Sequence, residues 1–167
     1  DNMCLDIVSL VEFLEIFKKT RIFIFGFTFM IWQYFYKSLQ KYNKTIDLSN
    51  AVLIHSGGWK KNTEQSVSKK TFNDNLFELT KLKNIYNFYG MVEQVGSIFM
   101  ECENGHFHTP IYSDIIIRDT LNWGVLPFNQ EGLIEVLSIL PKSYPGHVLL
   151  TEDLGIILGE DDCRCGR

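Results

Sequence analysis

The sequence lacks long basic runs and is poor in cysteine. It has 16 lysine and arginine residues against 20 acidic residues, a net charge of −4, and no basic run longer than two residues. A nucleic-acid partner is therefore not expected. Hydrophobic residues make up 46% of the 167 residues and aromatic residues 14%. This composition excludes a disordered chain and predicts one domain, or two small lobes, with a substantial core.

Neither a signal peptide nor a secreted disulfide framework is expected from this sequence. The four cysteines are irregularly spaced, unlike those of a small secreted protein, and Cys163-Arg164-Cys165 suits metal or redox chemistry better. No basic leader precedes an apolar run at the N-terminus, so no signal peptide is expected. The apolar stretch from Ile22 to Tyr36 is shorter than the roughly 20 residues of a membrane-spanning helix. We therefore expect a cytoplasmic protein with no membrane span.

Apolar periodicity predicts alternating helices and strands in the first part of the chain. Helices are expected at about 6–19, 28–42 and 66–82, with Thr28 as the N-cap of the second. Strands are expected at 21–27, 51–55 and 83–87, and the first should be buried on both faces because it is continuously apolar. This alternation predicts an α/β layer with parallel strands. The aromatic stripe of the second helix is predicted to be core: Phe29, Trp32, Phe35 and Tyr36.

The later part of the chain has a different pattern. Short strands are predicted at 97–102, 113–119, 132–139 and 147–150, separated by turn signals such as Asn122-Trp123-Gly124 and Tyr144-Pro145-Gly146. They predict a smaller, antiparallel, barrel-like β lobe. We place the boundary near Gly105, which divides the chain into an α/β part at 1–104 and a β-rich lobe at 105–167.

A glycine-bracketed loop between the strands at 83–87 and 97–102 offers one aromatic ring and one carboxylate. Gly90 and Gly96 bracket this loop, Tyr89 could stack on a flat base, and Glu93 could hold Mg²⁺ through oxygen. Ligands of α/β folds often bind beyond the carboxyl ends of strands. A plain turn with a solvated glutamate is the alternative.

Two other strand ends carry weaker signals. Gly57 and Gly58 follow the strand at 51–55, where they either let the backbone approach a ligand or form a tight turn. Asp153 either bonds sugar hydroxyls or forms an ordinary Asx turn. Neither the G-x-G-x-x-G fingerprint nor the G-x-x-x-x-G-K-[ST] phosphate loop occurs in the sequence.

Cysteine and histidine residues gather at the two ends of the predicted β lobe: Cys102, His106, His108, Cys163 and Cys165. Zinc prefers four nitrogen and sulfur ligands, and a Cys-x-Cys pair with a Cys…His hairpin could supply them. No open ligand position is evident, which favours a structural site. The alternatives are free cysteines with surface histidines, or a Cys–His nucleophile for acyl chemistry, although no oxyanion hole is evident.

Three segments together resemble the acyl-adenylating superfamily of acyl- and aryl-CoA synthetases and luciferases. Ser56-Gly57-Gly58 is similar to its adenine-side glycine motif, and Tyr89-Gly90-Met91-Val92-Glu93 to its Y-G-x-[TS]-E motif. Thr151-Glu152-Asp153-Leu154-Gly155 and Gly166-Arg167 resemble its T-G-D-L-G and G-R motifs. The Cys/His pattern resembles the phenylacetate–CoA ligase branch. The Gly-His-Phe-His and Ser-Gly-Gly-Trp-Lys segments, at 105–108 and 56–60, resemble the acyl-protein synthetase (LuxE) family.

The resemblance implies ATP-dependent activation of a carboxylic acid to an acyl-adenylate, followed by transfer to a thiol of coenzyme A or of a protein. The segment Tyr89-Gly90-Met91-Val92-Glu93 would bind the nucleotide: Tyr89 would stack on adenine and Glu93 would hold Mg²⁺. The resemblance further implies that Gly57 and Gly58 line the adenine, that Asp153 and Arg167 bind ribose hydroxyls, and that the zinc ligands are Cys102, His108, Cys163 and Cys165.

Two residues depart from the motifs: Val92 replaces a hydroxyl residue that meets the α-phosphate, and Glu152 replaces a glycine. The phosphate loop should precede residue 1, and the lid with its catalytic lysine should follow Arg167. We therefore expect a portion of the large N-terminal domain that is inactive alone. The alternative functions are a non-catalytic, zinc-stabilised binding module and a cysteine acyltransferase.

Overall fold

The computed structural model describes residues 4–59, 66–142 and 145–167. The chain forms two compact units, Asp1–Asn87 and Phe88–Arg167. Five strands follow one another in a mixed sheet of order β1-β2-β3-β4-β5, and the division falls within β3 (Asn84–Tyr89). The predicted boundary near Gly105 lies inside the second unit, because β4 and β5 form a hairpin whose first strand pairs with Phe88 and Tyr89.

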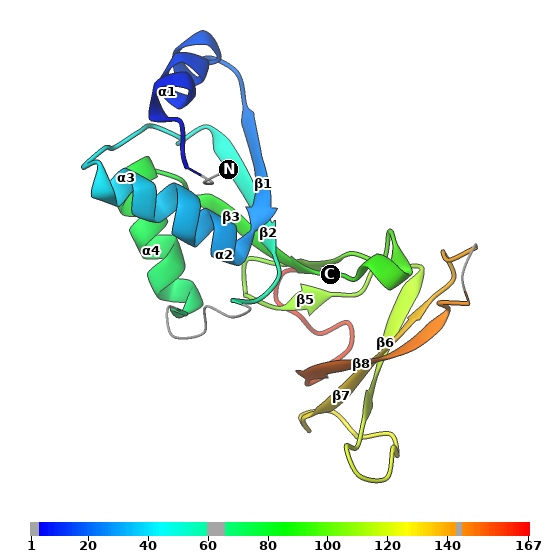
Figure 1. Cartoon of the computed structure of the whole chain (residues 1–167). Helices are drawn as coiled ribbons and strands as arrows, with labels where there is room; N and C mark the ends of the chain where they lie inside the picture. Colours follow the sequence, from blue (N-terminus) through cyan, green and yellow to red (C-terminus); the bar gives the residue numbers. More distant parts are fainter. Residues whose placement is uncertain (1–3, 60–65, 143–144) are drawn as a thin grey trace. The chain divides into compact units, whose positions relative to one another are not determined.

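The first unit is built from parallel strands and helices, as predicted (Figure 1). Strands β1 (Ile22–Phe27) and β2 (Ala51–Ser56) pair in parallel. The helical elements are α1 (Ile7–Ile16), α2 (Thr28–Met30), the π-helical segment η1 (Ile31–Tyr36), α3 (Lys37–Lys41) and α4 (Lys69–Thr80). Across the described ranges, every helix is too short or too polar to traverse a bilayer.

Polar caps set the starts of α1 and α4. The Asp6 carboxylate accepts a hydrogen bond from Ser9 N at 3.0 Å, and the Ser68 hydroxyl accepts one from Thr71 N at 3.1 Å. Each bond satisfies an amide that has no partner inside its helix. Both helices lie within their predicted ranges but are shorter at their ends. Lys60, the last residue of the Ser-Gly-Gly-Trp-Lys segment, and Tyr144 lie outside the described residues.

Thr28 was expected to be an N-cap, and this prediction is wrong. Phe27 occupies the cap position, and Thr28 is the first residue of α2. The Thr28 hydroxyl instead lies at the end of β2, 2.9 Å from His55 Nδ1 and 3.1 Å from the carbonyl oxygen of Ser56. Because the Thr28 hydroxyl is hydrogen-bonded to these buried partners, it does not cap the helix amides. The predicted helix at 28–42 is helical from Thr28 to Lys41, and its middle turns are π-helical.

Aromatic side chains of η1 pack in the core of the first unit, which confirms the prediction for Trp32, Phe35 and Tyr36 but not for Phe29. Trp32 stacks on Tyr36 with ring centroids 4.4 Å apart and on Phe72 at 5.8 Å. Phe35 packs against this cluster, while Phe29 is half-buried. The buried members of the cluster are Ile31, Trp32, Tyr36, Leu48, Ala51, Leu53, Phe72, Leu76 and Leu82.

Strand β1 is not buried on both faces, which corrects the prediction from its apolar run. Its side chains alternate in exposure, and those of Phe23 and Phe25 are 64% and 61% exposed. Ile22 and Ile24, on the other face, pack against the core. The strand lies at the edge of the sheet, and its apolar run reflects one covered face rather than two.

The second unit contains the end of β3, the short helix η3 (Val92–Gln94) and the hairpin of β4 (Phe99–Glu101) and β5 (Phe107–His108). Strands β6 (Ser113–Arg118), β7 (Gly132–Ser138) and β8 (Val148–Gly155) form a second sheet, antiparallel and in that order. The predicted antiparallel lobe is confirmed. As described, this sheet is open, with β6 and β8 at its edges.

Candidate nucleotide and metal sites

Tyr89 belongs to β3, which is longer than the predicted strand at 83–87, and Glu93 lies in the loop that follows β3. Tyr89 ends the strand, pairs with Phe99 of β4, and has its ring centroid 6.0 Å from that of Phe99. A side chain at Gly90 would place its Cβ 3.2 Å from the carbonyl oxygen of Ser97, so this close approach favours glycine. Glu93 lies in η3 with an exposed side chain, and Val92 beside it is 79% exposed.

A hydrogen bond joins two of the predicted nucleotide-binding segments. The Tyr89 hydroxyl donates to Asp153 Oδ2 at 2.8 Å, across 64 residues of sequence. Burial, together with this hydrogen bond, raises the pKa of Tyr89 to about 12. The phenol is therefore protonated at neutral pH and acts as the donor. The structure thus places the ring and the carboxylate in direct contact within the second unit.

Asp153 lies within β8 rather than at the strand-ending turn that its sequence context suggested. The pairing of β7 with β8 is irregular between Leu133 and Glu135. At this irregularity, the Thr151 hydroxyl donates to the carbonyl oxygen of Ile134 at 2.8 Å and accepts from Asp153 N at 3.2 Å. Irregularities of this kind often redirect a side chain from the regular ladder. Here the exposed Asp153 carboxylate meets Tyr89.

Three more residues were predicted to bind the nucleotide: Gly57, Gly58 and Arg167. Gly57 and Gly58 directly follow β2 in the first unit. Gly57 has φ of +77°, a conformation that favours glycine, and a Cβ built on Gly58 would meet no atom within 4 Å. Arg167 is exposed, and its backbone hydrogen-bonds to Cys165. The predicted roles of these three residues toward adenine and ribose stay predictions.

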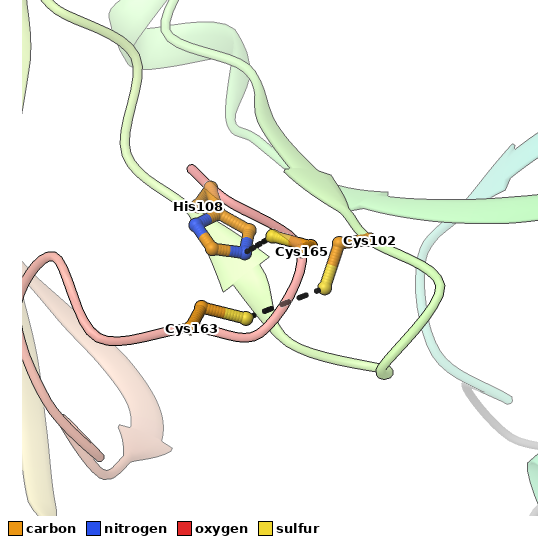
Figure 2. A group of neighbouring side chains, drawn as sticks. All are labelled: Cys102, His108, Cys163 and Cys165. Carbon is orange, nitrogen blue, oxygen red and sulfur yellow. Dashed lines mark hydrogen bonds between the residues drawn. The ribbon is translucent and has the colours of Figure 1, made fainter.

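Figure 2 shows the four predicted zinc ligands gathered in the second unit. Their ligand atoms all lie within 4.8 Å of one another: Cys102 Sγ, Cys163 Sγ, Cys165 Sγ and a ring nitrogen of His108. Cys102 Sγ is 3.9 Å from Cys163 Sγ, and Cys165 Sγ is 3.3 Å from His108 Nε2. Two sulfurs on a tetrahedral zinc, each about 2.3 Å from the metal, lie about 3.8 Å apart. The residues present therefore fit zinc.

Backbone hydrogen bonds shape the two segments that carry these ligands. Cys102 follows β4, and its amide donates to the carbonyl oxygen of His106 at 2.8 Å, which closes the turn before β5. His108 then pairs with Met100 across the hairpin. In the C-terminal segment, Gly166 N donates to the carbonyl oxygen of Cys163 at 3.0 Å. Each tight turn places its two ligands on one side.

The local environment separates the behaviour of the thiols. Burial opposes ionisation of the Cys102 thiol. Hydrogen bonds from the backbone of His106 and Asn104 and from the His108 side chain outweigh this effect and lower the pKa of Cys102 to about 6. Burial and the neighbouring thiols of Cys163 and Cys102 raise the pKa of Cys165. One sulfur is thus poised as a thiolate, the form that binds metals.

The structure also bears on the alternatives left open for these residues. The His106 ring lies beside the cluster, with its Nδ1 3.6 Å from Cys163 Sγ, but His106 is not one of the four residues whose ligand atoms gather. Cys102 is only 3% exposed and is surrounded by two other sulfurs, which leaves little room for an acyl substrate. Cys4 is exposed and belongs to the first unit.

Comparisons with known proteins agree with the motifs. The family model described as "Acyl-protein synthetase, LuxE" matches residues 3–167. The long-chain-fatty-acid–luciferin-component ligase of Vibrio harveyi is 30% identical over 131 residues, and the match covers 76% of this chain and 33% of that protein. The chain therefore spans about a third of the length of this relative.

Solved structures share the fold at low identity. ATP-bound MatB from Rhodopseudomonas palustris superimposes with a TM-score of 0.60 at 15% identity, covering 92% of this chain and 31% of that chain. The long-chain-fatty-acid-CoA ligase FadD1 from Archaeoglobus fulgidus gives 0.58 at 14%, covering 80% and 27%. The chain thus shares its fold with part of each of these structures. Because the family match runs from residue 3 to residue 167, this chain belongs to the acyl-protein synthetase (LuxE) family.

Proposed function

We propose that the full-length protein activates a carboxylic acid with ATP to an acyl-adenylate and transfers the acyl group to a thiol. The observation that carries this proposal is the hydrogen bond between Tyr89 and Asp153, 2.8 Å long. It joins the two segments that resemble the adenine and ribose motifs of acyl-adenylating enzymes. Family membership and the ligase name of the Vibrio harveyi relative support the same reaction class.

We assign the following roles to the candidate residues. Tyr89 offers its ring to adenine, while Asp153 and Arg167 bind ribose hydroxyls. Glu93 presents an exposed carboxylate, and carboxylate oxygens are ligands that Mg²⁺ accepts. The ion would neutralise charge that develops on the phosphates. Val92 has no hydroxyl to offer the α-phosphate, so that contact must come from another group. Gly57 and Gly58 would line the adenine.

The relative's name suggests a long-chain fatty acid as the acid substrate, and the family description suggests a protein thiol as the acceptor. The test is ATP–pyrophosphate exchange by the full-length protein, with fatty acids of increasing chain length. We expect exchange that depends on the acid. A second assay with labelled acid then distinguishes the two acceptors. If coenzyme A is the acceptor, the label appears in acyl-CoA when coenzyme A is added; if a protein thiol is the acceptor, the protein itself becomes labelled without any added thiol. Absence of acid-dependent exchange favours the zinc-stabilised binding module.

We further propose that residues 1–167 alone do not form acyl-adenylate. Electrostatic clamping of the phosphates supplies much of the barrier lowering in reactions of this type. The sequence of these residues contains no Ser/Thr/Gly-rich phosphate loop. Measurable acyl-adenylate made by this chain alone, with ATP, Mg²⁺ and a fatty acid, would contradict the proposal.

Two substitutions of Tyr89 separate the contribution of its ring to ATP binding from that of its hydroxyl. Tyr89→Ala is expected to weaken ATP binding by roughly 1–3 kcal/mol, the usual contribution of one aromatic ring stacked on a base. Tyr89→Phe keeps the ring and loses only the donor to Asp153, so its effect should be smaller. Calorimetric titration of the full-length variants with ATP measures both. Equal losses in the two variants would count against stacking.

For the cysteine and histidine cluster, we propose one structural zinc ion held by Cys102, His108, Cys163 and Cys165. The group supplies four ligands from two turns, which completes a tetrahedron without an open position for substrate. The zinc would tie the chain end to the β4–β5 hairpin within the second unit. Its role would be stability rather than reaction chemistry.

A further inference from the structure

Gln94, the residue after Glu93, is buried and holds η3 through its side chain. It is 1% exposed, and its Nε2 donates to the carbonyl oxygens of Val136 and Gly146 at 3.0 and 2.6 Å. Two carbonyl acceptors around one atom require the amide nitrogen there. Val136 lies in β7, and Gly146 lies in the turn before β8. One side chain thus attaches the loop to two parts of the antiparallel sheet.

Backbone and hydroxyl contacts reinforce this attachment. Gln94 N donates to the carbonyl oxygen of Met91 at 3.2 Å, and Ser97 N donates to the carbonyl oxygen of Gln94 at 3.0 Å. Ser97 is buried too, and its hydroxyl donates to Ser138 Oγ at 2.7 Å. The C-terminal side of η3 is therefore held by Gln94 and by Ser97, whose side chains bond outside the segment.

The helix geometry links the Gln94 anchor to the Glu93 carboxylate. A 3₁₀-helix has three residues per turn, so neighbouring side chains point about 120° apart. With Gln94 directed into the sheet, Glu93 must point elsewhere, and its side chain is exposed. A hydrocarbon side chain of the same length at 94 would remove both of these buried hydrogen bonds. It would also free η3 to rotate.

We propose that Gln94 is a positioning residue that orients the Glu93 carboxylate toward the metal–nucleotide complex. This inference rests on the proposed function, in which Glu93 holds Mg²⁺. Gln94 itself is buried and would contact neither nucleotide nor metal. Its effect on the reaction should therefore pass through Glu93 and appear as a changed requirement for Mg²⁺.

A double-mutant cycle in the full-length protein tests this coupling. The variants are Gln94→Met, Glu93→Gln and the double variant, each assayed by acid-dependent ATP–pyrophosphate exchange over a range of Mg²⁺ concentrations. Gln94→Met should raise the Mg²⁺ concentration for half-maximal rate and lower the rate by about tenfold, a smaller loss than the roughly 10²-fold or more that follows removal of the charge-stabilising group itself. In the Glu93→Gln background it should change the rate by less than about twofold, because coupled residues are not additive.

Two controls separate positioning from folding. Thr80→Val in the first unit removes a buried hydroxyl that donates to the carbonyl oxygen of Leu76 at 2.6 Å, and it should leave the Mg²⁺ dependence unchanged. If Gln94→Met does not fold, Gln94→Asn, which is one methylene shorter, carries the same expectation. An equal loss in both Glu93 backgrounds, or an unchanged Mg²⁺ dependence, would overturn the positioning role. An unchanged rate in the Glu93→Gln single variant would contradict the proposed function of Glu93, and with it the positioning role of Gln94.

Discussion

Glu93→Gln should lower acid-dependent ATP–pyrophosphate exchange by the full-length protein by about 10²-fold or more, the usual cost of removing one charge-stabilising group. The substitution keeps the size of an exposed side chain in η3 and removes only its charge. The loss should therefore come from poorer placement of Mg²⁺ on the phosphates. Stability of the fold should not change.

The matched control for this prediction is Glu131→Gln. Glu131 is an exposed carboxylate in the same unit, just before β7. It lies outside the motifs, so the exchange rate should stay at the wild-type level. A Glu93→Gln enzyme that keeps the wild-type rate at saturating ATP and Mg²⁺ would remove Glu93 from the site.

Elemental analysis of protein purified without added metal should find one zinc per chain. Structural zinc sites supply apparent binding free energies on the order of 10 kcal/mol at neutral pH. Chelation is therefore expected to loosen the second unit and lower the melting temperature strongly. Less than about 0.2 equivalents of zinc, with all four thiols freely titratable in the folded state, would overturn the site.

Single substitutions identify the ligands. Cys163→Ser and His108→Ala should each lose most of the zinc, since each removes one of the four gathered ligand atoms. Cys4→Ser is the matched cysteine control, because Cys4 is exposed and lies in the first unit. His106→Ala should keep the zinc, because His106 is not one of the four residues whose ligand atoms gather and its backbone is unchanged by the substitution. Zinc loss in His106→Ala but not in His108→Ala would reverse the assignment.

Local signals in the sequence predicted the elements, and tertiary contacts changed their details. The alternation of helices and strands and the antiparallel strands of the second sheet follow from short-range periodicity. Thr28 satisfies the composition of an N-cap, yet the buried His55 and Ser56, far along the chain, bind its hydroxyl. The apolar residues of β1 do not reveal how many faces are covered, because this depends on which elements pack on the sheet.

The sequence predicted some residues of the candidate site but not the contacts between them. The motifs predicted Tyr89 and Asp153 separately, while their hydrogen bond depends on the irregular pairing of β8 with β7, which has no sequence signature. Gln94 was missed because its partners are backbone carbonyls 42 and 52 residues away. Any residue can offer a carbonyl, so no pattern of side chains reports such an anchor.

Direct detection of acyl-adenylate tests the central claim. The full-length protein is incubated with Mg²⁺, ATP labelled in the adenylate moiety, and a long-chain fatty acid, without thiol acceptor, and the products are separated after acid quenching. The proposed function predicts a labelled acyl-adenylate that requires the acid and that decreases when a thiol acceptor is supplied. Labelled AMP or ADP formed independently of the acid, with no acyl-adenylate at any chain length, would contradict it.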